Sequence, residues 1–158
     1  MTRERYPLEP ARKLREHAVD EATDQLARSN AALEEAKAAA ERAQAAVRAH
    51  DEETDRIRAR EGERDIAGRT VAEMQHSLAY LERRGSERAE LSDRVRRAQE
   101  QAREAREAAE RARSALADAR AERDAVEKHH DRWQQGERRK AEARAEAEAE
   151  DVRAGRGK

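Results

Sequence analysis

Two adjacent histidines come closest to a metal-binding pattern in this sequence. His129 and His130 are followed by Glu137, and imidazole and carboxylate groups are common ligands of divalent metals. The surrounding residues are typical of a helix, on which neighbouring side chains point about 100° apart. Because one ion cannot easily take both imidazoles, we expect no metal site. His130 should face a partner helix, and His129 should face solvent.

Other catalytic chemistries are poorly represented. The sequence has no cysteine, which excludes disulfide bonds, thiolate metal sites and cysteine nucleophiles. It also has no glycine-rich phosphate loop, and no nucleophile lies at an informative spacing from a base. We therefore expect a protein that is not an enzyme and has no cofactor.

The composition is typical of long helices rather than of a globular core. Among 158 residues there are 36 alanines, 30 arginines and 26 glutamates, and no phenylalanine. The 35 basic and 36 acidic side chains leave a net charge of −1, which favours helices with paired charges over disorder and disfavours a nucleic-acid partner. No apolar run could cross a bilayer. We therefore expect a cytoplasmic protein with no direct membrane insertion.

Glycine and proline leave two long stretches of the chain uninterrupted. In both stretches, apolar or small residues recur with the alternating three- and four-residue spacing of a coiled coil. The simplest fold is all-α, a single coiled-coil domain over residues 1–158 in which two long helices form an antiparallel hairpin. We expect helix one over about 10–61, a connecting tip segment over 62–85, and helix two over about 86–152.

The inward positions of the two helices form a seam dominated by alanine. A trial register that matches residues by size places Ile57 near Leu91, and it places Trp133 beside the first turn of helix one. In helix one the predicted seam positions are Val19, Ala22, Leu26, Ser29, Leu33, Ala36, Ala40, Ala43, Val47, His50, Thr54 and Ile57. In helix two they are Leu91, Val95, Ala98, Ala102, Ala105, Ala109, Ala112, Leu116, Ala119, Arg123, Val126, His130 and Trp133.

The tip segment has a higher apolar density than its flanks. Val71, Met74, Leu78 and Leu81 recur there at helical spacing. This spacing predicts a short amphipathic helix at the tip of the hairpin. Its apolar strip either packs back on the hairpin or binds another protein.

Three stretches of the sequence resemble the YscO (SctO) family of type III secretion stalk proteins, which are related to the flagellar export protein FliJ. The opening YPLEPARKLREHAVDEA is similar to the family's aromatic and Pro-Leu lead-in to a charged first helix. The stretch RIRAREGERDIAGRTVAEMQHSLAYLERR resembles the family's central segment, and EKHHDRWQQGERRKAEARAEAEAED resembles its closing stretch. The resemblance covers nearly the whole chain. The alanine-rich seam, poorer in leucine than expected, departs from it.

This resemblance implies a non-enzymatic stalk that inserts into the hexameric type III secretion ATPase and couples it to the export gate, at the cytoplasmic face of the secretion apparatus. The family is also linked to secretion chaperones. By resemblance, the end with the paired termini would contact the ATPase, through Arg12, Lys13, Arg15, Trp133 and Arg139. The tip would contact the cytoplasmic domain of the export gate, through Val71, Met74, Gln75, Leu78 and Leu81.

An alternative belongs to another functional class. The same heptads would allow a structural scaffold protein that forms parallel dimers or bundles. A parallel dimer of extended helices would be about twice as long as a hairpin of the same chain. Mass and shape in solution therefore distinguish the two interpretations.

Overall fold

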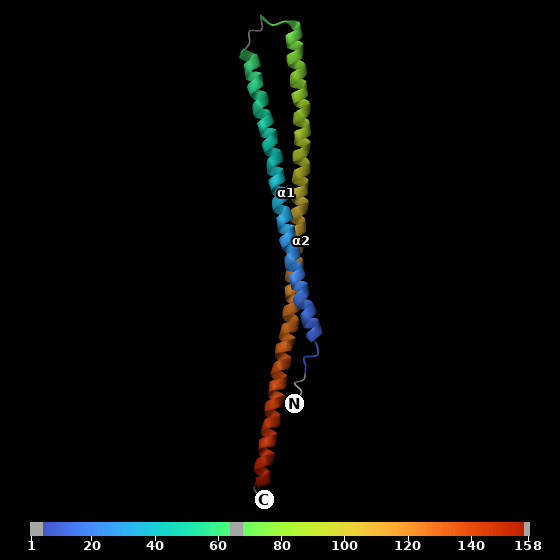
Figure 1. Cartoon of the computed structure of the whole chain (residues 1–158), viewed down its shortest axis with the longest axis vertical. Coiled ribbons are helices and arrows are strands. Elements are labelled where there is room, and N and C mark those ends of the chain that lie inside the picture. Colours follow the sequence, from blue (N-terminus) through green and yellow to red (C-terminus); the bar gives the residue numbers. More distant parts are fainter. Residues whose placement is uncertain (1–4, 64–67, 157–158) are drawn as a thin grey trace. The chain divides into compact units, whose positions relative to one another are not determined.

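The computed structural model describes residues 5–63 and 68–156, and it contains two long helices (Figure 1). Helix α1 spans Glu9–Glu63, and helix α2 spans Val71–Arg156. The two helices pack against each other as a helical hairpin, which confirms the all-α fold expected from the sequence. Residues 64–67 of the expected tip segment lie outside the described residues. Within the described residues, neither helix has a stretch long and apolar enough to cross a membrane.

Both helices begin with local features that satisfy free backbone groups. At the start of α1, the Glu9 amide donates to the Tyr6 carbonyl at 3.2 Å, and the acidic Glu9 side chain suits the positive end of the helix dipole. At the start of α2, Thr70 and Glu73 form a capping box. The Thr70 amide donates to the Glu73 carboxylate at 2.8 Å, and the Glu73 amide donates to Thr70 Oγ1 at 3.3 Å.

The segment that was expected to form a separate tip helix is divided differently in the structure. Residues 71–85 are the first turns of α2, which therefore begins about four turns earlier than expected. Gly85 lies inside the helix and does not interrupt it. An internal glycine costs a helix only about 1 kcal/mol relative to alanine, so the capping box at Thr70 determines where the helix starts.

The chain divides into two compact units, each made from parts of both helices. The terminal unit comprises Met1–Leu26 and Ala112–Lys158, and the tip unit comprises Ala27–Arg111. In the terminal unit the core contains Val19, Ala112 and Leu116. In the tip unit the most buried residue is Ala109, at 3% exposed.

The seam positions predicted from the heptad pattern are confirmed. All of them are buried or half-buried in the structure, including the polar residues Ser29 and Thr54. A seam built from alanines offers little apolar area per residue, so polar contacts between the helices matter more here than in a leucine-rich coiled coil.

The trial register was wrong. Arg88 forms a two-pronged ion pair with Asp51, at 2.8 and 3.0 Å, and Ile57 and Leu81 line the same hollow in the tip unit. The trial register had placed Ile57 near Leu91, about three helical turns away. Alanine follows alanine at the seam positions, so several registers give similar packing. Matching residues by size therefore could not select the correct register.

Candidate functional site

An exposed apolar strip lies on the first turns of α2 in the tip unit. Val71, Met74 and Leu78 follow one another at helical spacing, and their exposed fractions are 70%, 36% and 62%. Gln75 is also exposed and lies among them. Large apolar side chains left in water are typical of a surface that another protein covers.

Leu81, which the sequence grouped with this strip, has a different environment. It is half-buried, and it lines a hollow together with Ile57 of α1 and Tyr80. The structure therefore brings Val71, Met74 and Leu78 together on an exposed strip, while Leu81 packs toward the seam.

A hydrogen-bonded clamp holds the connection between the helices. Arg69, which precedes α2, forms an ion pair with Glu61 near the end of α1 and donates to Ser77 Oγ at 2.7 Å. The Ser77 hydroxyl in turn donates to the Glu61 carboxylate at 3.0 Å. Arg69 and Glu61 are both half-buried, and this network fixes the turns that carry the apolar strip.

A polar layer crosses the seam of the tip unit at His50, Asp51, Thr54, Arg84 and Arg88. Arg84 donates to Thr54 Oγ1 at 3.0 Å and to the His50 carbonyl at 2.9 Å. The hydrogen bond from Arg88 lowers the pKa of the Asp51 carboxyl below its ordinary value. The His50 ring is 7% exposed, and its nitrogens make no hydrogen bond to described residues. A polar layer of this kind favours one register over others, because slippage would separate its partners.

An aromatic cluster joins the start of the chain to α2 in the terminal unit. Tyr6 is 7% exposed, and its hydroxyl oxygen lies 2.7 Å from His129 Nδ1. The Tyr6 ring lies edge-on to His130, with centroids 4.8 Å apart, and its centroid is 5.3 Å from that of Trp133. The sequence-based placement of Trp133 beside the first turn of α1 agrees with this cluster, since Trp133 lines a hollow with Pro10.

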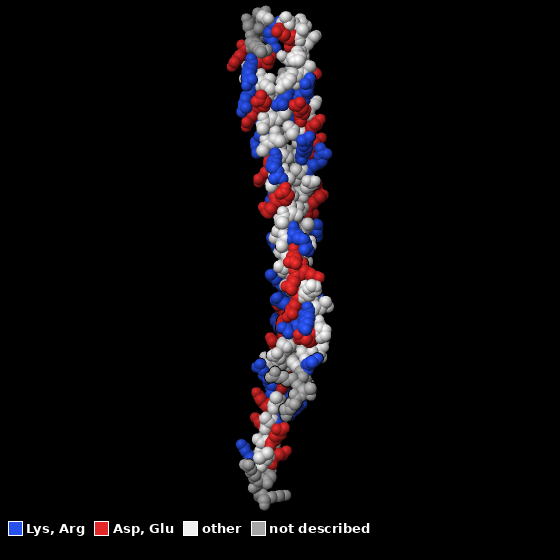
Figure 2. Space-filling view, in the orientation of Figure 1, with Lys and Arg blue, Asp and Glu red and all other residues white. Residues whose placement is uncertain are grey.

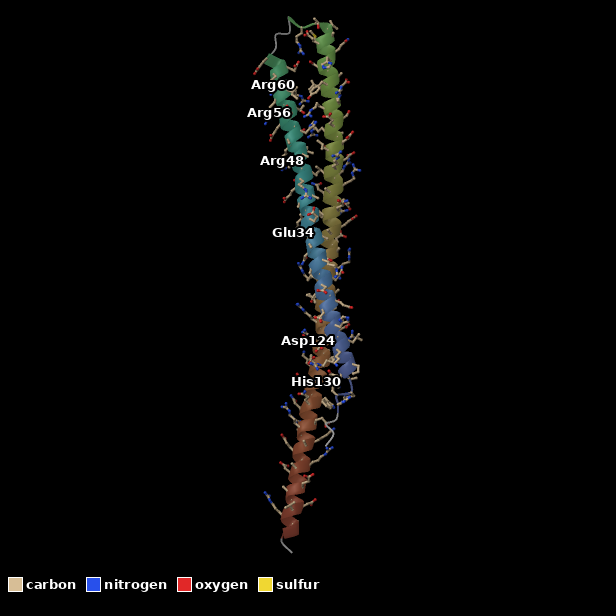
Figure 3. All side chains as sticks on the ribbon, in the orientation of Figure 1. Glu34, Arg48, Arg56, Arg60, Asp124 and His130 are labelled. Carbon is tan, nitrogen blue, oxygen red and sulfur yellow. The ribbon has the colours of Figure 1, made fainter. Side chains whose placement is uncertain are left out.

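The two histidines considered as metal ligands belong to this cluster. His130 is half-buried toward α1, as expected from the seam pattern (Figure 3). His129 is exposed, but its Nδ1 is hydrogen-bonded to Tyr6 rather than only to solvent. Within the described part of the chain, no group of three potential ligands is placed to hold a metal ion.

Two arginines proposed for partner contact join the helices of the terminal unit. Arg12 donates from Nε to Glu127 at 2.7 Å, and Arg15 forms an ion pair with Glu122. The hydrogen bond that Arg12 donates to Glu127 raises the pKa of Arg12 above its ordinary value. These contacts hold the start of α1 against α2, so Arg12 and Arg15 are engaged within the chain itself.

The other residues proposed at this end have more accessible surroundings. Lys13 is exposed and lines the same hollow as the half-buried Trp133. Arg139 lies further along α2, where residues 138–154 are all exposed. In the terminal unit, the red end of α2 continues past the first residues of α1 (Figure 1). The structure thus brings Lys13 and Trp133 together, and it places Arg139 on the part of α2 that α1 does not cover.

Acidic and basic side chains are interleaved on the visible surface of both units (Figure 2). Many of them pair within one helix, as Lys37 does with Glu34 at 2.8 Å. Such exposed pairs contribute about 0.2–0.5 kcal/mol each to helix stability. They account for the charged composition without requiring a charged ligand.

Sequence reasoning missed two important residues. Tyr6 was noted only as part of the lead-in, because its partner His129 lies far away in the chain. Arg84 was not recognised as part of the seam. The heptad spacing that runs from Leu91 back to Arg84 was a signal that could have found it.

The family comparison decides the broad identity of the chain. Residues 3–154 match the model of the YscO-like protein family. The chain belongs to the YscO-like family. This family comprises structural proteins of type III secretion, so the chain is a type III secretion-associated protein. No curated protein and no solved structure matches this YscO-like protein.

Proposed function

We propose that this YscO-like protein is the non-enzymatic central stalk of a type III secretion export apparatus. Its terminal unit inserts into the hexameric secretion ATPase, and its tip unit contacts the cytoplasmic domain of the export gate. The protein acts at the cytoplasmic face of the apparatus, and secretion chaperones are further partners. The family match over residues 3–154 is the observation that carries this proposal.

The exposed apolar strip supports a partner contact at the tip unit. Full burial of Val71 or Leu78 by a partner would contribute about 1.5–3 kcal/mol for each side chain. The Arg69–Glu61–Ser77 clamp holds these first turns of α2 in place before binding. A preorganised strip loses less conformational entropy when a partner binds.

Accessible residues support a partner contact at the terminal unit. Lys13 and Arg139 offer exposed cations, and Trp133 offers a partly exposed aromatic surface. Arg12 and Arg15 contribute indirectly, because they fix α1 to α2 through Glu127 and Glu122. The terminal unit therefore has both exposed contact groups and internal bracing.

Helix continuity supports a coupling role. Both α1 and α2 contribute residues to both units without interruption. A helix is stiff along its axis because every turn is hydrogen-bonded to the next. A load applied at the terminal unit would therefore reach the tip unit through continuous backbone.

ATP hydrolysis by the cognate secretion ATPase tests the proposal. The ATPase is assayed at concentrations where it forms hexamers, with and without the purified chain. We expect the chain to stimulate hydrolysis. Neither stimulation nor binding by a folded sample would contradict the stalk role.

Substitution of two strip residues tests the tip contact. We expect Met74→Asp combined with Leu78→Asp to abolish binding to the export-gate domain, because both carboxylates would have to be desolvated at the interface. Circular dichroism should show unchanged helicity, since both side chains are accessible. Ala79→Asp, which is exposed on the same helix but off the strip, is the matched control and should bind normally. Unchanged binding of the double variant would refute the tip assignment.

Charge reversal tests the terminal contact. Lys13→Glu combined with Arg139→Glu should weaken ATPase stimulation without disturbing the hairpin, because both residues are exposed. Arg12→Glu would be a poorer test, since it would place two carboxylates together at Glu127. Lys37→Glu in the tip unit is the control. Full stimulation by the double variant would count against terminal insertion.

The scaffold alternative is tested by mass and shape. In each unit, residues of α2 cover the seam of α1, so the described parts of the two helices leave no apolar seam for a parallel partner. Sedimentation should therefore give the mass of one chain. A stable dimer of twice the hairpin length would favour the scaffold interpretation.

A further inference from the structure

The terminal unit contains a hollow that is lined by apolar rings and by basic side chains. Its volume is about 750 Å³, and the apolar part of its lining includes Tyr6, Pro7, Pro10 and Trp133. Aromatic rings and prolines are rigid, so this surface needs little reordering when it is covered. The volume is sufficient for several side chains of a bound peptide.

The charges around the hollow do not cancel. Arg5 and Lys13 also line it, and neither forms an ion pair with an acidic residue among the described residues. Glu9 is the acidic residue that lines the hollow, and its carboxylate is already shared with Arg12, at 3.4 Å. The hollow therefore presents two cations to an approaching ligand.

Contacts within the aromatic cluster hold the aromatic residues of the hollow in place. The hydrogen bond of 2.7 Å between the Tyr6 hydroxyl and His129 Nδ1 anchors one wall to α2. His130, which also lines the hollow, contacts the Tyr6 ring edge-on, with ring centroids 4.8 Å apart. Trp133 stacks on His130, with an interplanar angle of 26° and centroids 6.2 Å apart, and this contact holds the orientation of the Trp133 ring.

We propose that this hollow binds an acidic peptide segment that carries one apolar anchor residue. The anchor contacts Pro10 and Trp133, and carboxylates of the segment lie beside Arg5 and Lys13. Such a peptide segment would belong to the partner that contacts the terminal unit, so this inference rests on the proposed function for its biological setting. The cations Arg5 and Lys13 favour an acidic segment, and the apolar part of the lining favours an apolar anchor residue.

The test uses three blocked pentapeptides and the intact chain. The first has one leucine flanked by two glutamates on each side, the second replaces the glutamates with lysines, and the third replaces the leucine with serine. Trp133 is the single tryptophan of the chain, so its fluorescence reports directly on the hollow. We expect the acidic leucine peptide to shift the emission to shorter wavelength and to saturate. The lysine peptide should leave it unchanged, and the serine peptide should bind at least about tenfold more weakly.

Two substitutions of Lys13 test whether the change in Trp133 fluorescence depends on this basic residue of the hollow. Lys13→Glu should weaken binding of the acidic peptide by about tenfold or more, and Lys13→Gln should weaken it less. Lys140→Glu, an exposed lysine of the same unit outside the hollow, should bind as the unmodified chain does. Binding should also fall as salt is raised.

Several results would overturn the inference. They are unchanged Trp133 emission at millimolar acidic peptide, equal binding of the lysine peptide, and equal loss in the Lys13→Glu and Lys140→Glu variants. The ATPase assay separates this inference from the stalk role. Stimulation without peptide binding would refute only the hollow, whereas peptide binding without stimulation or ATPase binding would refute only the stalk.

Discussion

Removal of the Tyr6 side chain should loosen the start of α1 from α2. Tyr6 is 7% exposed, and a buried aromatic side chain covers about 150–250 Å². At about 25 cal/mol per Å², and with allowance for a compact denatured state, Tyr6→Ala should lower the free energy of unfolding of the terminal unit by about 3–4 kcal/mol. Tyr6→Phe keeps the ring and loses only the contact with His129, so it should cost about 1 kcal/mol.

Urea titration with two probes measures this effect. Trp133 fluorescence follows the aromatic cluster, and circular dichroism follows the helices as a whole. Both Tyr6 variants should lower the midpoint of the fluorescence transition, with Tyr6→Ala far below Tyr6→Phe. Leu14→Ala, at a position that is 63% exposed in the same unit, is the matched control and should change little.

The reasoning would be refuted if the Tyr6→Ala midpoint coincided with that of Leu14→Ala. It would also be refuted if Tyr6→Phe were as damaging as Tyr6→Ala. The first result would mean that the cluster does not hold the terminal unit together. The second would mean that the hydroxyl, rather than burial of the ring, dominates the contact.

Three further predictions concern the tip unit. Arg84→Ala should lower the free energy of unfolding by about 1–3 kcal/mol in urea titration, because it removes hydrogen bonds to Thr54 and to the His50 carbonyl. The neighbouring Arg83 is exposed, so Arg83→Ala is the control and should change the free energy of unfolding by less than about 0.5 kcal/mol. Because Arg88 lowers the pKa of Asp51, the stability from this pair is fully present above about pH 4 and is lost as the pH falls through the lowered pKa. Carboxyl NMR should show the Asp51 pKa returning toward its ordinary value of 3.8 in Arg88→Ala, and an unchanged pKa would contradict the pairing. Gly85→Ala should raise the thermal midpoint, with a gain of about 0.5–1 kcal/mol, because the added methyl group meets nothing within 4 Å beyond its chain neighbours and the adjacent backbone of α2. A lower midpoint would contradict the helical geometry.

The inward faces of the helices could be predicted because they depend on local periodicity. A residue such as Ala40 or Leu116 faces the partner helix whenever both stretches are helical and apolar residues recur every 3.5 positions on average. This inference needs no knowledge of which residue lies opposite. It therefore succeeded along both helices, even at the polar positions His50 and Arg123.

The start of α2 also depends on neighbouring residues, although the helix was expected to begin at about residue 86. Thr70 and Glu73 have the spacing of a capping box, which would have indicated a helix beginning at Val71. Gly85, which was expected to mark a boundary, lies inside α2. A glycine ends a helix when the chain needs a positive φ, and no described residue has one.

The two long helices of this YscO-like protein, and the face of each helix that turns inward, could be predicted because they follow from composition and from repeats within one segment. The register, the joining of Tyr6 to His129, and the separation of exposed Leu78 from half-buried Leu81 depend on contacts between distant residues and became apparent in the folded chain. The reason is that an alanine seam packs similarly in several registers, so a few polar contacts between distant residues select one of them.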